Sequence, residues 1–304
     1  MLDVTLVRIG QLIGKPPGWE RVVRALAPPM CFANREVRAS PQPDGYMFPV
    51  DRGTLLGWSV HFFGTYEPEV QTEIRRYLTP GAIAIDVGAN VGWHTLLMAA
   101  RAGSTGRVYA FEPNASTRRR LVSAVEANDL AQVTVDGRAV ADLVGASGFQ
   151  APPAGHVWDG TGRLIAAQAQ DGRDGRERQE GRERQEGQEG QTTRIECTTL
   201  DAFVAEQHIE QLALVKIDVE GWELSVLRGA RHVLSALRPV VVFEYDPAYV
   251  SRSGGAAEDL TRCWSNADYE LFALDPRHPP ARVARLGDRG GNFLALPRRA
   301  AGDR

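Results

Sequence analysis

The sequence predicts an α/β protein with a doubly wound, mostly parallel sheet. Three observations point to this fold class. Short apolar runs alternate with segments of helical periodicity between residues 82 and 243. The first apolar run ends in an acid and then a turn of small residues, Asp86-Val87-Gly88-Ala89-Asn90-Val91-Gly92. Two more apolar runs near the C-terminus suit a closing antiparallel pair. Such alternation is typical of a parallel sheet covered on both faces.

The elements are expected in a regular order. Residues 1–80 form an N-terminal extension or cap, with strand-like stretches in 46–60 and a helix over 67–78 that has Pro68 near its start. Residues 81–304 form the main domain. Its expected strands are 82–87, 107–111, 132–135, 212–217 and 240–243, and its expected helices are 93–102, 115–128 and 222–237. Residues 269–274 and 292–296 form the predicted antiparallel pair.

One segment has the composition of a disordered insertion. Residues 171–191 contain no apolar side chain, and the hexapeptide at 175–180 recurs identically at 181–186. A stretch without apolar residues cannot offset the entropy lost on ordering. We therefore expect a low-complexity surface loop there.

Composition narrows the class of protein. The formal net charge of −3 shows no basic surplus, which argues against nucleic acid as the main partner. Since 43% of the residues are hydrophobic, the chain can form a full core. Cys31, Cys197 and Cys263 are far apart, so neither a disulfide framework nor a structural zinc site is expected. No apolar run approaches the length of a membrane span. These features predict a cytoplasmic protein. An apolar face at the N-terminus is expected to dock on the domain or on a second copy of the chain, and it comprises Leu2, Leu6, Ile9 and Ile13.

The turn after the first strand has the character of a nucleoside-binding loop. Gly88, Ala89 and Gly92 permit close approach of backbone to a ligand, and Asn90 stands between the glycines. Glu112, followed by Pro113, ends the next strand, where a carboxylate can accept hydrogen bonds from both ribose hydroxyls. This layout suits S-adenosylmethionine better than a dinucleotide.

Further residues are expected around the same cofactor. Asp86 is expected to orient the loop or to meet the cofactor ammonium through water. Ala139 and Val140 follow the third strand, where they would present a small apolar surface to the adenine. Asp142 suits either the adenine amine or the cap of a surface turn.

A second acidic motif follows the fourth strand. Residues 214–223 place Asp218, Glu220 and Glu223 at a carboxyl strand end, the edge at which open α/β sheets bind ligands. Glu244 ends the next strand, and His94 lies two residues after Gly92. Asp218 is the first candidate for a general base, with Glu220, Glu244 and His94 as further candidates. His94 is equally consistent with a partly buried helix residue.

With these motifs together, the chain resembles the FkbM-type methyltransferase family. The resemblance rests on Asp86 to Gly92, on Phe111-Glu112-Pro113 and on Lys216 to Glu223, and it covers roughly residues 64–245. It implies a class I methyltransferase fold, which is Rossmann-like, S-adenosylmethionine as cofactor and O-methylation of a hydroxyl on a sugar, glycan or natural product. Glu67 lies in a segment similar to the family's entry segment. It would meet the cofactor tail or the acceptor, or would only charge the first turn of a helix.

Three alternatives stay open. A nicotinamide-dependent oxidoreductase shares the strand–turn–helix start and the ribose acid. A non-catalytic binding module would keep the fold alone. A divalent cation held by Asp218 with Glu220 or Glu244 is compatible with oxygen ligands but is not favoured, because no histidine joins them in sequence.

Overall fold

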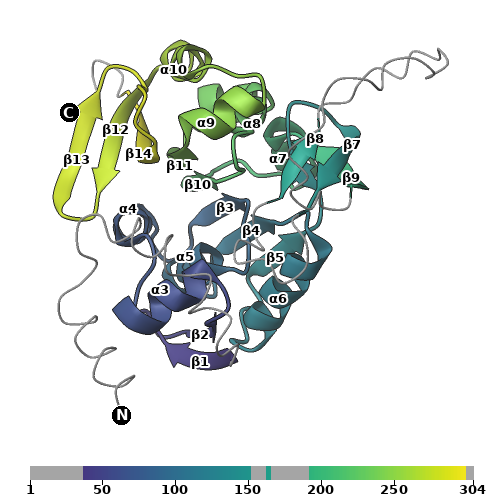
Figure 1. Cartoon of the computed structure of the whole chain (residues 1–304), viewed down its shortest axis with the longest axis vertical. Coiled ribbons are helices and arrows are strands. Elements are labelled where there is room, and N and C mark those ends of the chain that lie inside the picture. Colours follow the sequence, from purple (N-terminus) through teal and green to yellow (C-terminus); the bar gives the residue numbers. More distant parts are fainter. Residues whose placement is uncertain (1–36, 152–161, 166–191, 299–304) are drawn as a thin grey trace, which may run out of the picture.

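The computed structural model describes residues 37–151, 162–165 and 192–298. Its centre is an eight-stranded sheet in the order β13-β12-β14-β11-β10-β3-β4-β5 (Figure 1). The strands from β11 to β5 run parallel, and β14 pairs antiparallel with both β11 and β12. The strands are β3 (Ile83–Val87), β4 (Arg107–Phe111), β5 (Val133–Asp136), β10 (Leu214–Ile217), β11 (Val240–Tyr245), β12 (Tyr269–Asp275), β13 (His278–Val283) and β14 (Gly291–Pro297).

This topology confirms the expected doubly wound, mostly parallel sheet with its antiparallel C-terminal strand. The predicted pair at the C-terminus is β12 and β14, which are registered from Tyr269 opposite Pro297 to Ala273 opposite Phe293. The edge strand β13 was not predicted. Two adjacent prolines, Pro279 and Pro280, lie within it. Because proline cannot donate to a strand ladder, it is tolerated mainly on edge strands, so the position of β13 agrees with its composition.

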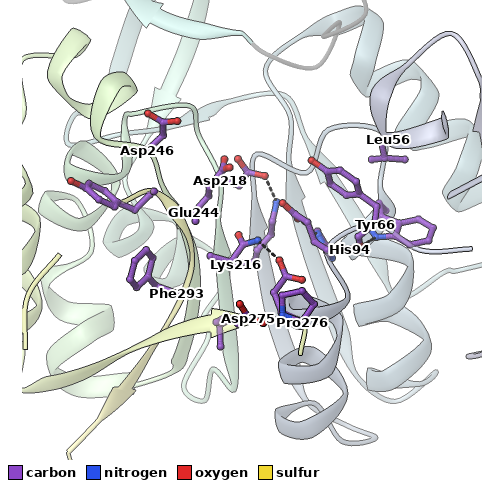
Figure 2. A pocket seen from close by; sticks show the side chains of 18 of the residues that line it. Leu56, Tyr66, His94, Lys216, Asp218, Glu244, Asp246, Asp275, Pro276 and Phe293 are labelled. Carbon is purple, nitrogen blue, oxygen red and sulfur yellow. Dashed lines mark hydrogen bonds and ion pairs between the residues drawn. The ribbon is translucent and has the colours of Figure 1, made fainter. Parts of the chain in front are cut away.

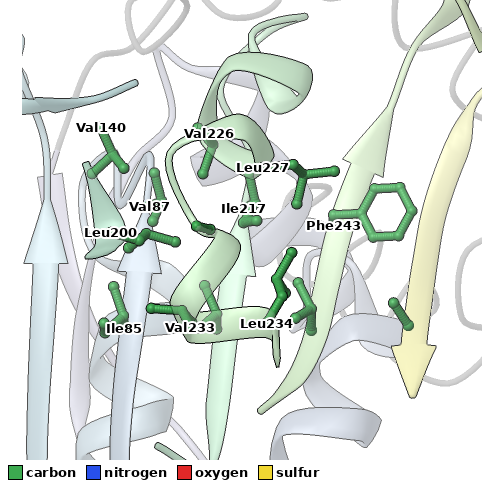
Figure 3. Packing of buried hydrophobic residues seen from close by; sticks show 14 of the residues in the cluster. Ile85, Val87, Val140, Leu200, Ile217, Val226, Leu227, Val233, Leu234 and Phe243 are labelled. Carbon is green, nitrogen blue, oxygen red and sulfur yellow. The ribbon is translucent and has the colours of Figure 1, made fainter. Parts of the chain in front are cut away.

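Helices cover both faces of the sheet, and alternate side chains of each strand enter different cores. Ile85 and Val87 belong to one apolar cluster, whereas Ala84 belongs to the other. The first cluster is shown in Figure 3 and includes residues of α7 (Leu200–Glu206), α8 (Glu223–Arg228), the π-helix η1 (Val233–Leu237), α9 (Pro247–Arg252) and α10 (Ala257–Asn266). The second includes residues of α4 (Pro68–Tyr77), α5 (Trp93–Ala102) and α6 (Ala115–Glu126). The helices predicted over 67–78, 93–102 and 115–128 are present as α4, α5 and α6.

The N-terminal region adds a hairpin and a helix. Strands β1 (Val37–Pro41) and β2 (Met47–Asp51) pair antiparallel, and α3 (Leu55–Phe63) follows. The strand-like prediction for 46–60 was wrong after Asp51. The hydroxyl of Thr54 accepts a hydrogen bond from the Gly57 N–H at 3.1 Å and so caps a helix instead. Phe48 of β2 packs edge-on against Trp93 at a centroid distance of 4.8 Å, which joins this region to the second core.

The single helix predicted over 222–237 is broken in two. It ends with α8 at Arg228, and η1 begins at Val233. Gly229 lies so close to the carbonyl of Ala141 that a Cβ there would come within 2.2 Å of its oxygen. The Asp201 carboxylate accepts hydrogen bonds from the N–H groups of His232 and Val233. Tertiary packing and a remote cap therefore end one helix and start another.

A small second sheet was not anticipated at all. Strands β6 (Ala139–Val140), β7 (Gly145–Gln150), β8 (Arg163–Ile165) and β9 (Thr192–Thr198) form it in the order β6-β9-β7-β8. The predictions about Cys31, the apolar N-terminal face and the repeat at 171–191 fall outside the described residues. Within those that are described, every helix is too short or too polar to cross a lipid bilayer.

Candidate functional site

Two neighbouring cavities lie at the carboxyl ends of the parallel strands. The large cavity has a volume of about 960 Å³, and the small cavity has a volume of about 70 Å³. Glu112 and Asp218, which the sequence analysis expected on one edge, both line the small cavity. Asn90, Asp218 and Glu220 line both, so the two cavities meet at these residues. This is the crevice in which open α/β sheets bind ligands.

The glycines of the turn after β3 are required by contacts within the protein. Gly88 has φ 78°, and a Cβ there would lie 1.8 Å from the carbonyl oxygen of Asp218. Gly92 has φ 95°, and its Cβ would lie 2.6 Å from Cδ1 of Leu121 on α6. Gly88 also lines the small cavity, whereas Gly92 lines neither cavity. Gly88 therefore lies where backbone could approach a ligand, which stays a prediction, and Gly92 permits close packing against α6.

The rest of the loop is tied to the end of β4. The N–H of Ala89 donates to the carbonyl of Phe111, and the N–H of Asn90 donates to Oε2 of Glu112 at 2.9 Å. The other carboxylate oxygen of Glu112 accepts from the Asn114 N–H at 2.8 Å. Burial raises the pKa of Glu112 to about 7, although these hydrogen bonds oppose the rise. Each oxygen keeps a lone pair for a ligand hydroxyl.

Apolar residues form the remainder of the small cavity. Pro113, Ala139 and Val140 line it, as the sequence analysis expected, and the last two are buried. Asp142 is not among its lining residues. Its Oδ1 accepts a hydrogen bond from the Ser225 hydroxyl at 2.8 Å, which favours the alternative of a structural turn.

Asp86 does not reach either cavity. It is fully buried, and its Oδ2 accepts a hydrogen bond from the Thr95 hydroxyl at 2.6 Å. Its Oδ1 lies 3.6 Å from Nζ of Lys216. Asp86 was expected either to orient the loop or to meet the cofactor ammonium through water. Its contacts are with Thr95 and Lys216, and its side chain lines neither cavity.

Asp218 and Glu220 follow β10, Glu244 lies near the end of β11, and these acids form one cluster with Lys216. Oδ2 of Asp218 lies 3.1 Å from Nζ of Lys216 (Figure 2). The carboxyls of Asp218 and Glu244 share a side-chain hydrogen bond. Burial opposes ionisation of Asp218, but Lys216 and the hydrogen bond from Glu244 outweigh it and lower the pKa of Asp218. Burial and the Asp218 charge raise the pKa of Glu244 well above its usual range. The same surroundings therefore shift the pKa values of the two acids in opposite directions, downward for Asp218 and upward for Glu244.

Glu220 and Glu223 have different environments. Glu220 adopts φ 54°, unusual for a residue with a side chain, and burial together with Asp218 raises its pKa to about 8. Glu223 lines neither cavity. Its Oε1 accepts from the N–H groups of Val219 and Gly221, so it stabilises the loop in which Glu220 lies. Glu223 thus lies near the carboxyl end of β10, as expected, but its side chain is directed into the loop.

Glu67 and His94 form a pair in the wall of the large cavity, which Asp218, Glu220 and Glu244 also line. Glu67 precedes α4 with φ 49°, and its Oε2 lies 2.9 Å from Nε2 of His94. Both residues line the large cavity, although His94 is only 5% exposed. Glu67 makes no side-chain cap to α4. The pair therefore belongs to the cavity wall, and the Glu67 carboxyl also lies at the N-terminus of α4, where Glu67 is the N-cap residue.

The sequence analysis missed several lining residues. Tyr66 lines the large cavity, and the neighbouring Glu67 together with burial raises the pKa of its phenol well above the usual value. Phe149, Leu164 and Trp222 enclose the small cavity. Trp222 sits inside the second acidic motif, so position alone was a usable signal for it. Phe149 and Leu164 come from the small sheet, and no signal in the sequence predicted that sheet.

The residues present suit S-adenosylmethionine in kind. The carboxylate of Glu112 and the apolar pair Ala139 and Val140 match a ribose and an adenine. The small cavity alone is well below the roughly 300 Å³ of a typical ligand pocket, but it is continuous with the large cavity at Asn90, Asp218 and Glu220. Among the described residues, no cluster of three or more His, Cys, Asp or Glu side chains is arranged to hold a metal ion.

Comparison with known proteins identifies the fold's relatives. The model of the methyltransferase FkbM domain matches residues 86–271. The AMB antimetabolite synthetase AmbE of Pseudomonas aeruginosa is 31% identical over 205 residues, which is 61% of this chain and 9% of that protein. The chain thus spans less than a tenth of the length of that relative.

Two solved structures are also similar. Methyltransferase FkbM from Methylobacillus flagellatus is 18% identical, with a TM-score of 0.40, over 78% of this chain and 52% of that one. SMU.1697c from Streptococcus mutans, in complex with SAH, is 8% identical, with a TM-score of 0.42, over 76% of this chain and 98% of that one.

Proposed function

The chain belongs to the FkbM methyltransferase family, and we propose that it transfers the methyl group of S-adenosylmethionine to a hydroxyl of a sugar, glycan or natural product. Family membership makes it an S-adenosylmethionine-dependent methyltransferase. It also decides against the nicotinamide alternative. The acceptor atom and the acceptor class are the parts that we propose.

One observation carries the proposal. Asp218, the ionised acid of the cluster, lies where the small cavity meets the large one. The small cavity has the residues for a nucleoside, and the large cavity has room for an acceptor. A base at their junction is next to the point where the transferred methyl group and an acceptor hydroxyl would meet.

The chain's own residues have defined tasks in such a reaction. When bound, the cofactor supplies an electrophilic methyl group on a sulfonium sulfur. Glu112 and the loop around Asn90 hold the nucleoside, and Asp218 accepts the hydroxyl proton as the new bond to oxygen forms. A positioned base of this kind contributes about 10²–10⁴-fold, and alignment of the reactants supplies much of the remaining acceleration.

The walls of the large cavity support an acceptor of some length. Leu56 of α3 and Tyr66 come from the N-terminal region, whereas Phe293 and Pro276 come from β14 and the β12–β13 turn on the opposite side (Figure 2). Nδ2 of Asn292 donates to Oε1 of Glu69 at 2.9 Å, which links β14 to α4. We propose that residues 37–80 act as a cap over the acceptor. The name of the AmbE relative, an antimetabolite synthetase, supports a natural product as the acceptor class.

The test compares Asp218→Asn with the wild-type chain. Binding of S-adenosylmethionine, measured by calorimetry, should be retained in the variant. Transfer of a ¹³C-methyl group to a panel of glycosides and hydroxylated natural products should fall by about 10²–10⁴-fold. The chemical shift of the product methyl distinguishes O-, N- and C-methylation. Asp259→Asn on α10, outside both cavities, is the matched control. Unchanged transfer in Asp218→Asn, or a product methylated on nitrogen or carbon, would refute the proposal.

A further inference from the structure

Strand β10 carries a charged residue where an apolar one would be expected. All four of its residues are buried, and one of them is Lys216, which is 5% exposed. Lysine is almost never fully buried unless it is paired, and burying an ion costs several kcal/mol before its partners compensate. A role beyond packing must therefore explain Lys216.

The partners of Lys216 come from two strands and one loop. Lys216 is registered directly beside Asp86 on the parallel neighbour β3, and its Nζ lies 3.6 Å from Oδ1 of that residue. The same Nζ donates to the carbonyl of Gly88 at 3.4 Å and to Oδ2 of Asp218 at 3.1 Å. Figure 2 shows the side chain of Lys216 directed from the sheet toward Asp218. The ammonium thus joins the cofactor loop to the acid at the junction of the cavities.

Asp86 is placed to act on Lys216 and not on a ligand. It is fully buried and lines neither cavity. Its Oδ1 has no hydrogen-bond partner among the described residues, which leaves the lysine as its nearest cation. Asp86, the first acid of the loop motif, therefore stabilises the charge of Lys216 in the buried pair of Lys216 and Asp218.

We infer that Lys216 is a positioning residue for Asp218: supported from behind by Asp86 and the Gly88 carbonyl, it holds the Asp218 carboxylate ionised and directed at the junction of the cavities. This inference rests on the proposed function only for the role of Asp218 as base. The charge relationship itself is a property of the protein without any ligand.

The surroundings of Asp218 explain why it needs a cation. The groups that face it are acidic or neutral apart from Lys216 and His94, and they include Glu67, Glu220, Glu244 and the phenol of Tyr66. Burial and the neighbouring carboxyls raise the pKa of Glu220 and of Glu244. The pKa of Asp218 is lowered instead, and Lys216 is the first of the groups that lower it. Without Lys216, the same burial would raise the pKa of Asp218, so that a smaller fraction of it would be ionised and able to act as a base.

The experiment is an NMR titration of the full-length protein labelled with ¹³C in its aspartate carboxyls. The signal of Asp218 is identified by its loss in Asp218→Asn. In Lys216→Met, the apparent pKa of Asp218 should rise by about 1 to 3, the usual effect of an opposite charge at this distance. Lys216→Arg keeps the charge and should keep most of the effect. Lys15→Met removes the only other lysine of the chain and is the matched control.

A second measurement applies if Lys216→Met does not fold. Because the chain contains two lysines, ¹⁵N-lysine labelling of the wild type yields two side-chain signals, and Lys216→Arg identifies the one of interest. That signal should report a charged ammonium from pH 6 to pH 9. A neutral amine at pH 7, or an Asp218 titration that is identical in wild type and Lys216→Met, would overturn the inference. Failure of the proposed function appears separately, as absence of methyl transfer to hydroxyls by the wild type.

Discussion

The N–H of Asn90 donates to Oε2 of Glu112 at 2.9 Å, so the loop after β3 and the acid after β4 form one unit. Asn90 adopts φ 50°, the left-handed conformation that asparagine tolerates better than most residues. The turn that this conformation produces directs the loop N–H toward the neighbouring strand end. The position of the Glu112 carboxylate therefore depends on the loop, and the shape of the loop depends on Glu112.

This coupling predicts the effect of Glu112→Gln. The amide nitrogen that replaces one oxygen cannot accept a hydrogen bond, so either the Asn90 or the Asn114 N–H loses its partner. Hydrogen bonds to charged groups contribute about 1.5–3 kcal/mol, so the Kd for S-adenosylmethionine should rise roughly 10- to 100-fold. Calorimetric titration measures this. Glu126→Gln, at an exposed site on α6, should bind like the wild type, and equal affinities of the two variants would contradict the coupling.

The contact between Gly88 and Asp218 predicts a large cost for Gly88→Ala. The residue has φ 78°, and the new methyl group would meet the Asp218 carbonyl oxygen at 1.8 Å. Gly254 offers a close comparison, because it has φ 82° but nothing within 4 Å of a Cβ. The left-handed conformation alone costs an alanine about 1–2 kcal/mol. Urea denaturation should show a loss of that size for Gly254→Ala and a clearly larger one for Gly88→Ala. Similar losses would mean that backbone conformation alone requires the glycine.

Glu223 predicts a pH dependence of stability. Burial raises its pKa in the folded protein to about 7, above the ordinary glutamate value of 4.5. The folded state therefore binds the proton more tightly than the unfolded state, and stability falls as the pH rises from about 4.5 through about 7. This one residue accounts for up to about 3 kcal/mol of that loss.

The measurement is the free energy of unfolding at several pH values between 5 and 8. Glu223→Gln does not titrate, so its stability should decline less over this range than that of the wild type. Glu258→Gln, at an exposed site on α10, should follow the wild-type slope. If the slopes of wild type and Glu223→Gln coincide, the buried carboxyl does not have the raised pKa.

Much of the site could be predicted because its residues lie next to strands that have a clear apolar pattern in the sequence. Gly88, Glu112 and Asp218 each follow an apolar run, and parallel strands bring their carboxyl ends to one edge. Phe149 and Leu164 were not readable, because they come from short strands beside a segment with little apolar pattern. The role of Asp86 was left open between the loop and the ligand, because its position in the motif says nothing about which face of the strand is covered.

The sequence by itself determined the alternation of strands and helices, the family motifs and the identity of the acids at the strand ends. These are local properties, since periodicity and turn chemistry act over a few residues. Only the tertiary structure decided which acid is ionised. The charge of Asp218 depends on Lys216 from the same strand, on Asp86 from the next strand and on Glu244 from β11, and electrostatic energies follow distances and burial that no local pattern encodes.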